Sequence, residues 1–153
     1  MIYFVDEDVS QISQWASILR MKGMQTCVLR DADTALEHLS QCDDIELVFI
    51  DVMLAAAPDT QNRIFTRAQT DDYHSTGVEL LKALVERQPR FFPSYAIFLS
   101  QAGQSMILEK VKLTVQEFRN EVLFWQKGSF ASVKDFAAKT EEEIKRRTKS
   151  KNS

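Results

Sequence analysis

The sequence predicts a single α/β domain with a parallel sheet covered by helices on both faces. Short apolar segments alternate five times with amphipathic segments, and such alternation indicates a parallel sheet with crossover helices. The apolar segments are also nearly continuous, which is typical of strands buried on both faces. A chain of 153 residues suits one domain with one core.

The predicted strands are apolar runs that stop at polar residues, a pattern typical of short buried strands. They cover residues 2–5, 26–29, 45–50, 95–99 and 121–125. The first run stops at Asp6, the third at Asp51 and the fourth at Ser100. The last continues to Lys127 through a single polar residue. Each strand except the second therefore delivers chemically useful side chains at its carboxyl end.

The predicted helices are segments in which apolar residues recur every three or four positions. The first begins at Ser10, a plausible N-cap, and ends at Gly23. The second covers residues 32–39, and the third begins at residue 78. The last two cover residues 106–118 and 133–144.

Two segments do not fit this alternation. Residues 55–76 contain a proline, many polar residues and no sustained period, which predicts a long loop of the kind that is usually functional or disordered. Residues 148–153 (TKSKNS) are expected to form a disordered tail. The predicted domain therefore spans residues 1–147, with an insertion at about 55–76 after the third strand.

Composition excludes several classes of protein. The formal net charge of −3 gives the domain body no basic footprint for nucleic acid, so we expect no direct DNA binding. Cys27 and Cys42 are the only cysteines, too few for a disulfide scaffold, which favours a reducing cytoplasm. The first residues carry no basic segment and only a short apolar run, so neither a signal peptide nor a membrane span is expected.

Polar side chains converge at one edge of the predicted sheet. Asp6, Glu7 and Asp8 follow the first strand, and Asp51 follows the third. In such sheets ligands bind outside the carboxyl ends of the strands. Crowded carboxylates raise one another's pKa unless a cation lies between them. Oxygen ligands at a water-accessible rim suit Mg²⁺, which also binds phosphate.

Asp51 is the central residue of this group. A carboxylate can act as a nucleophile and form an acyl-phosphate. Lys127 and Mg²⁺ would offset the charge on the phosphoryl oxygens, and Ser100 could donate a hydrogen bond to one of them. Singly, an Asp after a strand is usually a turn former or a helix cap. The combination is more specific because four strands must all end in suitable chemistry.

The order FVDED…LVFIDVML…IFLS…FWQKG resembles the receiver domain of bacterial response regulators, of the CheY-like superfamily. The resemblance covers about residues 1–147 and implies a flavodoxin-like, doubly wound sheet in the order 2-1-3-4-5. It assigns the Mg²⁺-positioning acidic pair to Asp6 and Glu7, the phospho-acceptor to Asp51, a metal-ligating backbone carbonyl to Met53, the switch hydroxyl to Ser100, the switch aromatic to Phe124 and the family's lysine to Lys127.

The same resemblance implies a signalling function. A sensor histidine kinase, a phosphotransfer protein or a small phosphodonor would supply the phosphoryl group. Ser100 would then move toward the phosphate and Phe124 would follow it inward. The surface of the fourth helix, fifth strand and fifth helix would change shape for a downstream protein target or a homodimer. Catalysis would be limited to the domain's own phosphorylation and dephosphorylation.

Three departures from the family pattern are visible. Gly128 stands where the family usually has a proline after a cis peptide bond, and a Lys–Gly bond should be trans. Glu7 replaces the commoner aspartate. The family places a glycine shortly after the acceptor, whereas the matching Gly77 lies 26 residues after Asp51. This spacing indicates an insertion beside the phosphorylation site.

Two alternatives remain open. The string Asp6-Glu7-Asp8-Val9-Ser10 fits the first motif of haloacid-dehalogenase-type phosphohydrolases, with Asp6 as nucleophile. That class needs acidic ligands after the lysine and leaves Asp51 without a role. The insertion and the altered segment at Lys127 favour a second alternative, a degenerate receiver that acts only as a protein-binding module.

Overall fold

The computed structural model describes residues 1–54, 64–66, 69–70, 75–101 and 105–151. Its centre is a five-stranded parallel sheet in the order β2-β1-β3-β4-β5. This confirms the predicted fold class and strand order. The strands are β1 (Ile2–Val5), β2 (Thr26–Leu29), β3 (Leu47–Ile50), β4 (Ala96–Ser100) and β5 (Leu123–Gln126).

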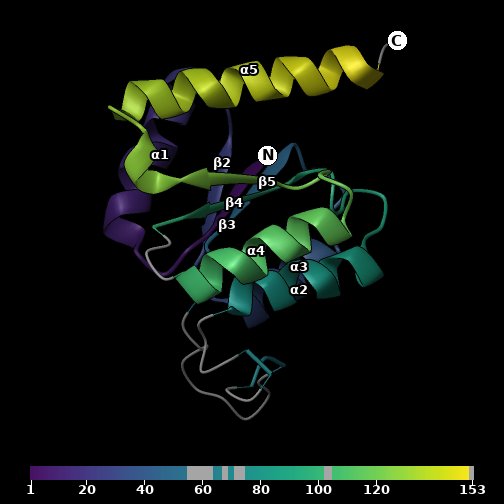
Figure 1. Ribbon diagram of the computed structural model, residues 1–153. Helices are drawn as coiled ribbons and strands as arrows, with labels where there is room; N and C mark the ends of the chain where they lie inside the picture. Colours follow the sequence, from purple (N-terminus) through teal and green to yellow (C-terminus); the bar gives the residue numbers. More distant parts are fainter. Residues whose placement is uncertain (55–63, 67–68, 71–74, 102–104, 152–153) are drawn as a thin grey trace.

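Helices cover both faces of the sheet (Figure 1). One face carries α1 and α5, and the other carries α2, α3 and α4. Their bounds are α1 (Val9–Met21), α2 (Ala32–Ser40), α3 (Thr76–Arg87), α4 (Ser105–Glu117) and α5 (Val133–Lys151). A single 3₁₀ turn, η1 (Lys127–Ser129), follows β5. None of the helices in the described residues is long and apolar enough to cross a membrane.

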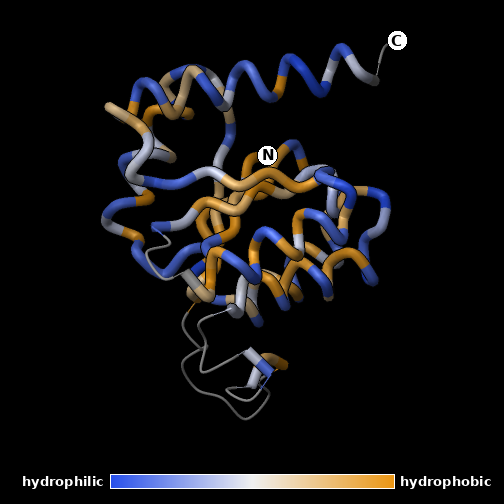
Figure 2. Tube along the Cα trace, in the orientation of Figure 1, coloured by the Kyte–Doolittle hydropathy of each residue, from blue (hydrophilic) through white to orange (hydrophobic). Residues whose placement is uncertain are grey.

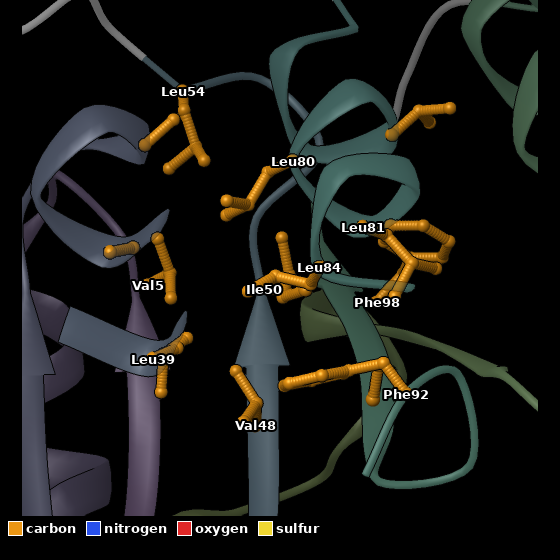
Figure 3. Close-up of a cluster of buried hydrophobic side chains, with 14 of the residues drawn as sticks. Val5, Leu39, Val48, Ile50, Leu54, Leu80, Leu81, Leu84, Phe92 and Phe98 are labelled. Carbon is orange, nitrogen blue, oxygen red and sulfur yellow. The ribbon is translucent and has the colours of Figure 1, made fainter. Parts of the chain in front are cut away.

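The two faces of the sheet build cores of different composition. Toward α2 and α3 the core is mainly aliphatic, and Figure 3 shows Ile50 of β3 beside Leu84 of α3. Toward α1 and α5 it is rich in aromatic rings, with Phe49 stacked on Phe4 at 5.0 Å between centroids. Successive strand residues point to opposite faces, so β3 contributes to both cores. Figure 2 accordingly shows the strands as the most hydrophobic part of the chain.

The first helix begins two residues earlier than predicted, because its N-cap is not Ser10. The N-cap is Asp8, whose carboxylate accepts hydrogen bonds from the Gln11 N–H (3.3 Å) and the Ser10 hydroxyl (2.9 Å). The prediction of Ser10 is therefore wrong. A carboxylate caps a helix and also interacts favourably with its dipole. Gly23 does end this helix, and its φ of +88° is a left-handed conformation that suits glycine.

The disordered tail expected from residue 148 is also wrong for residues 148–151, because α5 continues to Lys151. Arg147 pairs with Glu143 one turn earlier, and Thr148 bonds the Ile144 carbonyl. Such contacts stabilise the helix beyond the apolar pattern that defined the prediction. Residues 152–153 lie outside the described residues. The predicted strand starts at residues 45 and 121 are each two residues early, which is ordinary for strand ends.

The insertion after β3 is partly described. Phe65 is only 2% exposed and joins the aliphatic core. The backbone N–H groups of Ile64 and Phe65 both donate to the Asp33 carboxylate of α2, at 2.6 and 3.4 Å. At least this part of the insertion is therefore anchored to the domain rather than projecting from it. His74, to which we assign no metal role, lies outside the described residues.

Candidate functional site

Four of the sequence-predicted site residues meet at the carboxyl edge of the sheet. Asp6 and Asp51 directly follow β1 and β3, which pair in register, and the Asp51 N–H donates to the Val5 carbonyl at 3.0 Å. Ser100 is the last residue of β4, and Lys127 follows β5. The strand topology alone thus brings together side chains that are as far as 121 positions apart in the sequence.

Lys127 is buried between the two aspartates. Its Nζ lies 2.6 Å from Asp6 Oδ2 and 3.9 Å from Asp51 Oδ2, and the side chains of Lys127 and Asp6 are each only 3% exposed. Among the described residues the one cis peptide bond joins Phe92 and Pro93, so the Lys127–Gly128 bond is trans, as expected. The missing proline does not prevent the lysine from reaching the site.

Asp51 is hydrogen-bonded through one carboxylate oxygen and has a raised pKa. Its Oδ1 accepts hydrogen bonds from the Ser100 hydroxyl (2.9 Å) and the Met53 N–H (3.3 Å). Burial, together with the negative charge of Asp6, raises the pKa of Asp51 to about 6. Lys127 and the two hydrogen bonds act in the opposite direction but do not cancel the effect. A further positive charge beside Asp51 would therefore favour its ionised form.

The donor set for Mg²⁺ is only partly assembled. Asp6 is already engaged through both oxygens, since Oδ1 accepts from the Asp8 N–H (2.9 Å) and Oδ2 pairs with Lys127. Glu7 is exposed, and across the described residues no group of three or more His, Cys, Asp or Glu side chains could hold a metal. The carboxylate oxygens of Asp6 and Asp51 still suit a hard cation. Glu7 as a third ligand stays a prediction.

The predicted switch aromatic lies two strands away from Asp51, with β4 between them. Phe124 of β5 pairs in register with Phe98 of β4 and is half-buried against the aliphatic core. It also lines an apolar groove of about 350 Å³ with Val111 and Val115 of α4. Phe124 therefore connects the sheet to the surface of α4.

Gly77 has a structural role that only its spacing in the sequence suggested. Its N–H donates to the Val52 carbonyl at 2.9 Å. A Cβ at this position would lie 2.2 Å from the Asp51 carbonyl oxygen, which is closer than any real contact. The start of α3 thus packs directly on the backbone at Asp51 and Val52, and only glycine allows that approach.

The structure resembles solved receiver domains over nearly its whole length. A CheY-like response regulator receiver domain from Methanospirillum hungatei JF-1 has a TM-score of 0.64 at 18% identity, covering 97% of this chain and 96% of that one. The receiver domain of NtrX from Brucella abortus has a TM-score of 0.61 at 22% identity, covering 95% and 98%.

A third similar structure departs from this group in its described role. It belongs to a streptococcal family of redox sensors that evolved from two-component response regulators. It has a TM-score of 0.70 at 14% identity, with 99% of this chain and 53% of that chain covered. No protein-family model and no curated protein sequence matches the chain. The shared strand order and the extent of these overlaps show that the chain has the fold of the CheY-like receiver domains of response regulators.

Proposed function

We propose that this chain is a phospho-accepting receiver domain in which modification of Asp51 switches a protein-interaction surface. The observation that carries the proposal is the environment of the Asp51 carboxylate. One oxygen accepts from Ser100 at 2.9 Å, the other lies 3.9 Å from the Lys127 ammonium, and the side chain is 13% exposed. A nucleophile held between two donors at the ligand edge of the sheet suits phosphoryl transfer.

The reaction would proceed as an in-line displacement. An Asp51 oxygen forms a bond to phosphorus, while the bond from phosphorus to the donor's histidine nitrogen or carboxylate oxygen breaks. With a pKa of about 6, Asp51 is mostly ionised at neutral pH and needs no base. Lys127 offsets negative charge on the phosphoryl oxygens, and the Ser100 hydroxyl donates to one of them.

Magnesium fits this proposal through the acidic residues of the rim. Asp6, Asp51 and the Met53 carbonyl would hold the ion, with Glu7 nearby in sequence, and bound Mg²⁺ would supply charge neutralisation for the incoming phosphoryl group. Asp6 must loosen its 2.6 Å contact with Lys127 to do so. The lysine is then free to turn toward the phosphoryl oxygens.

The switch would begin at the bond between Ser100 and Asp51. After transfer, the Ser100 hydroxyl would exchange its present acceptor for a phosphoryl oxygen, and Phe124 would move toward the space it leaves. The groove between α4 and β5 would change shape as a result. The expected partners are a sensor histidine kinase or phosphotransfer protein upstream and an unidentified protein target downstream, with a homodimer as one arrangement.

Acetyl phosphate provides the direct test. Incubation with Mg²⁺, followed by intact-mass measurement and peptide mapping, should place one phosphoryl group on Asp51. Asp51→Asn should abolish the modification, whereas Asp43→Asn, an exposed aspartate outside the site, should leave it unchanged. Modification of Asp6 instead would indicate the hydrolase alternative. That alternative has lost support because the Asp8 carboxylate caps α1.

A degenerate receiver is the second candidate, and the Asp6–Lys127 pair favours it. This pair satisfies a metal-binding carboxylate with the protein's own cation, so binding of Mg²⁺ has to compete with it. Titration with Mg²⁺ to millimolar concentration, followed through Trp125 fluorescence, separates the two candidates. A saturable change supports the phospho-accepting receiver, and an unchanged signal together with no labelling of Asp51 supports the degenerate one.

A further inference from the structure

A second polar pocket lies at the opposite end of the sheet from Asp51. It has a volume of about 550 Å³ and is lined by Arg90, Ser94, Tyr95, Glu121, Arg146 and Arg147 among others. Tyr95 directly precedes β4, and Glu121 comes just before β5. The pocket is therefore at the amino edge of the parallel sheet, where the last turns of α5 cover it. Figure 2 shows that this half of α5 is mostly hydrophilic.

Two of its arginines share one carboxylate. Arg147 donates from Nε to Glu143 at 2.9 Å and from Nη1 to the Ser94 carbonyl, and its guanidinium lies over the Tyr95 ring at 5.8 Å. Arg146 donates to the same carboxylate at 2.5 and 3.2 Å. Burial lowers the pKa of Arg147 despite the charge of Glu143. One negative charge thus serves two guanidinium groups.

The third arginine comes from the other side of the pocket and is not neutralised. The Arg90 guanidinium lies over the Phe91 ring at 4.8 Å, and it pairs with no carboxylate in the part of the chain that the structure describes. Glu121 also lines the pocket and accepts from the Ser94 hydroxyl at 3.3 Å. Three guanidinium groups therefore face two carboxylates, which leaves a surplus of positive charge.

We propose that this pocket binds the phosphate group of a small anionic ligand, either inorganic phosphate or the phosphate of a mononucleotide. Guanidinium groups present planar pairs of donors that match phosphate oxygens. The Arg146 side chain is 65% exposed, so it can reorient toward a ligand. The Arg147 side chain is only 14% exposed and is held in place by its contacts. The volume is within the range of small-molecule sites.

A small ligand fits these observations better than a nucleic acid does. The site is a concave pocket rather than an extended basic surface, and the chain as a whole carries a net charge of −3. Glu121 inside the pocket would repel the neighbouring phosphates of a long polyanion. The proposal is also independent of Asp51, because the two sites occupy opposite edges of the sheet.

Isothermal titration calorimetry on the full chain at low ionic strength tests this proposal, with inorganic phosphate and adenosine monophosphate as probes. Saturable binding of either probe is expected, and a tighter fit for the nucleotide would identify it as the better source of the phosphate. Arg90→Gln and Arg146→Gln should each weaken binding by about tenfold, the size expected for a hydrogen bond between charged groups. Glu121→Gln removes a repulsive charge and should strengthen binding several-fold.

Two control variants locate the effect. Arg30→Gln removes an exposed arginine that follows β2 at the opposite edge, and it should leave the dissociation constants unchanged. Asp51→Asn should do so as well, which separates this site from the proposed phospho-acceptor. The proposal is overturned if neither probe binds at millimolar concentration, or if the arginine and glutamate variants bind like the unchanged protein. It is equally overturned if duplex DNA binds more tightly than both probes through the same arginines.

Discussion

The two ends of the sheet hold charge imbalances of opposite sign. At the carboxyl edge, the carboxylates of Asp6 and Asp51 share one cation, Lys127. At the amino edge, the guanidinium groups of Arg146 and Arg147 share one anion, Glu143. The two proposals therefore place an added cation at the first end and an added anion at the second.

The two ends differ in how deeply the shared ion lies. Lys127 is 3% exposed and its nearer partner is equally buried, whereas the Arg146 partner of Glu143 is 65% exposed. Desolvation makes a buried pair costly to break, while solvent screens an exposed one. Burial raises the pKa of Asp51 to about 6 at the first end and lowers the pKa of Arg147 at the second. Changes at the carboxyl edge should accordingly have the larger effects.

The largest loss is expected from Lys127→Ala. It leaves Asp6 buried without its 2.6 Å partner, and removing one member of a buried ion pair typically costs about 3–5 kcal/mol. The free energy of unfolding, measured by urea titration at neutral pH, should fall by that amount.

The matched control is Lys112→Ala, because Lys112 is exposed on α4 and surface substitutions usually change stability by less than about 0.5 kcal/mol. Similar losses from both substitutions would show that the Asp6–Lys127 pair is not a buried electrostatic element. The deeper burial at the carboxyl edge would then have no energetic consequence.

Gly77→Ala tests how tightly the backbone at Asp51 is packed. The added Cβ would lie 2.2 Å from the Asp51 carbonyl oxygen and 2.8 Å from the Val52 Cα. Since both are backbone atoms, the segment itself must shift, at a cost of about 3 kcal/mol. Gly128→Ala is the control, because a Cβ there meets nothing within 4 Å. Equal thermal melting of the two variants would mean that α3 does not constrain the backbone at Asp51.

The carboxyl edge was largely predictable from the sequence, and the amino edge was not. Asp6, Asp51 and Ser100 each end an apolar run, and Lys127 follows the last run after one polar residue. The ends of parallel strands meet by topology, so the convergence follows from the strand pattern. The arginines at the other edge occur in a turn and in a helix end with no shared motif. Their proximity depends on how α5 crosses the sheet, which its hydrophobic period does not determine.

Local chemistry explains the errors of detail. Both Asp8 and Ser10 are good N-cap residues, and the choice depends on which side chain reaches the free N–H groups. The extension of α5 to Lys151 depends on polar contacts such as Glu143 with Arg147, which an apolar pattern does not reveal. Lys127 Nζ lies 2.6 Å from Asp6 and 3.9 Å from Asp51, and this difference is too small for spacing in the sequence to encode.

Asp51→Asn should stabilise the protein in the absence of Mg²⁺. The pKa of Asp51 is about 6 in the folded state and 3.8 when unperturbed, so the folded protein disfavours the ionised form. Wild-type stability therefore falls as pH rises from about 4 to about 6, and the asparagine variant escapes this loss. The expected difference in unfolding free energy is about 3 kcal/mol at neutral pH and close to zero below about pH 3.

Urea titrations of both proteins across this pH range provide the measurement. Added Mg²⁺ should reduce the difference, because a bound cation favours the ionised carboxylate. A difference that stays constant with pH would assign the stabilisation to packing rather than to the charge of Asp51.

The smallest effect is expected at the amino edge, from Glu143→Gln. Burial acts to raise the pKa of Glu143, but hydrogen bonds and charges from Arg146 and Arg147 outweigh it and lower the pKa. The contribution of Glu143 is therefore present above its unperturbed pKa of 4.5 and is lost as pH falls through its lower folded value. Because solvent screens Arg146, the substitution should cost only about 1 kcal/mol at neutral pH.

The neighbouring exposed Glu142→Gln is the control for net charge, and urea titration of both variants provides the comparison. The two edges respond to acid in opposite directions. The difference in unfolding free energy between variant and unchanged protein, plotted against pH, should therefore have opposite signs for Asp51→Asn and Glu143→Gln. Profiles of the same sign would contradict the assignment of opposite charge imbalances to the two ends of the sheet.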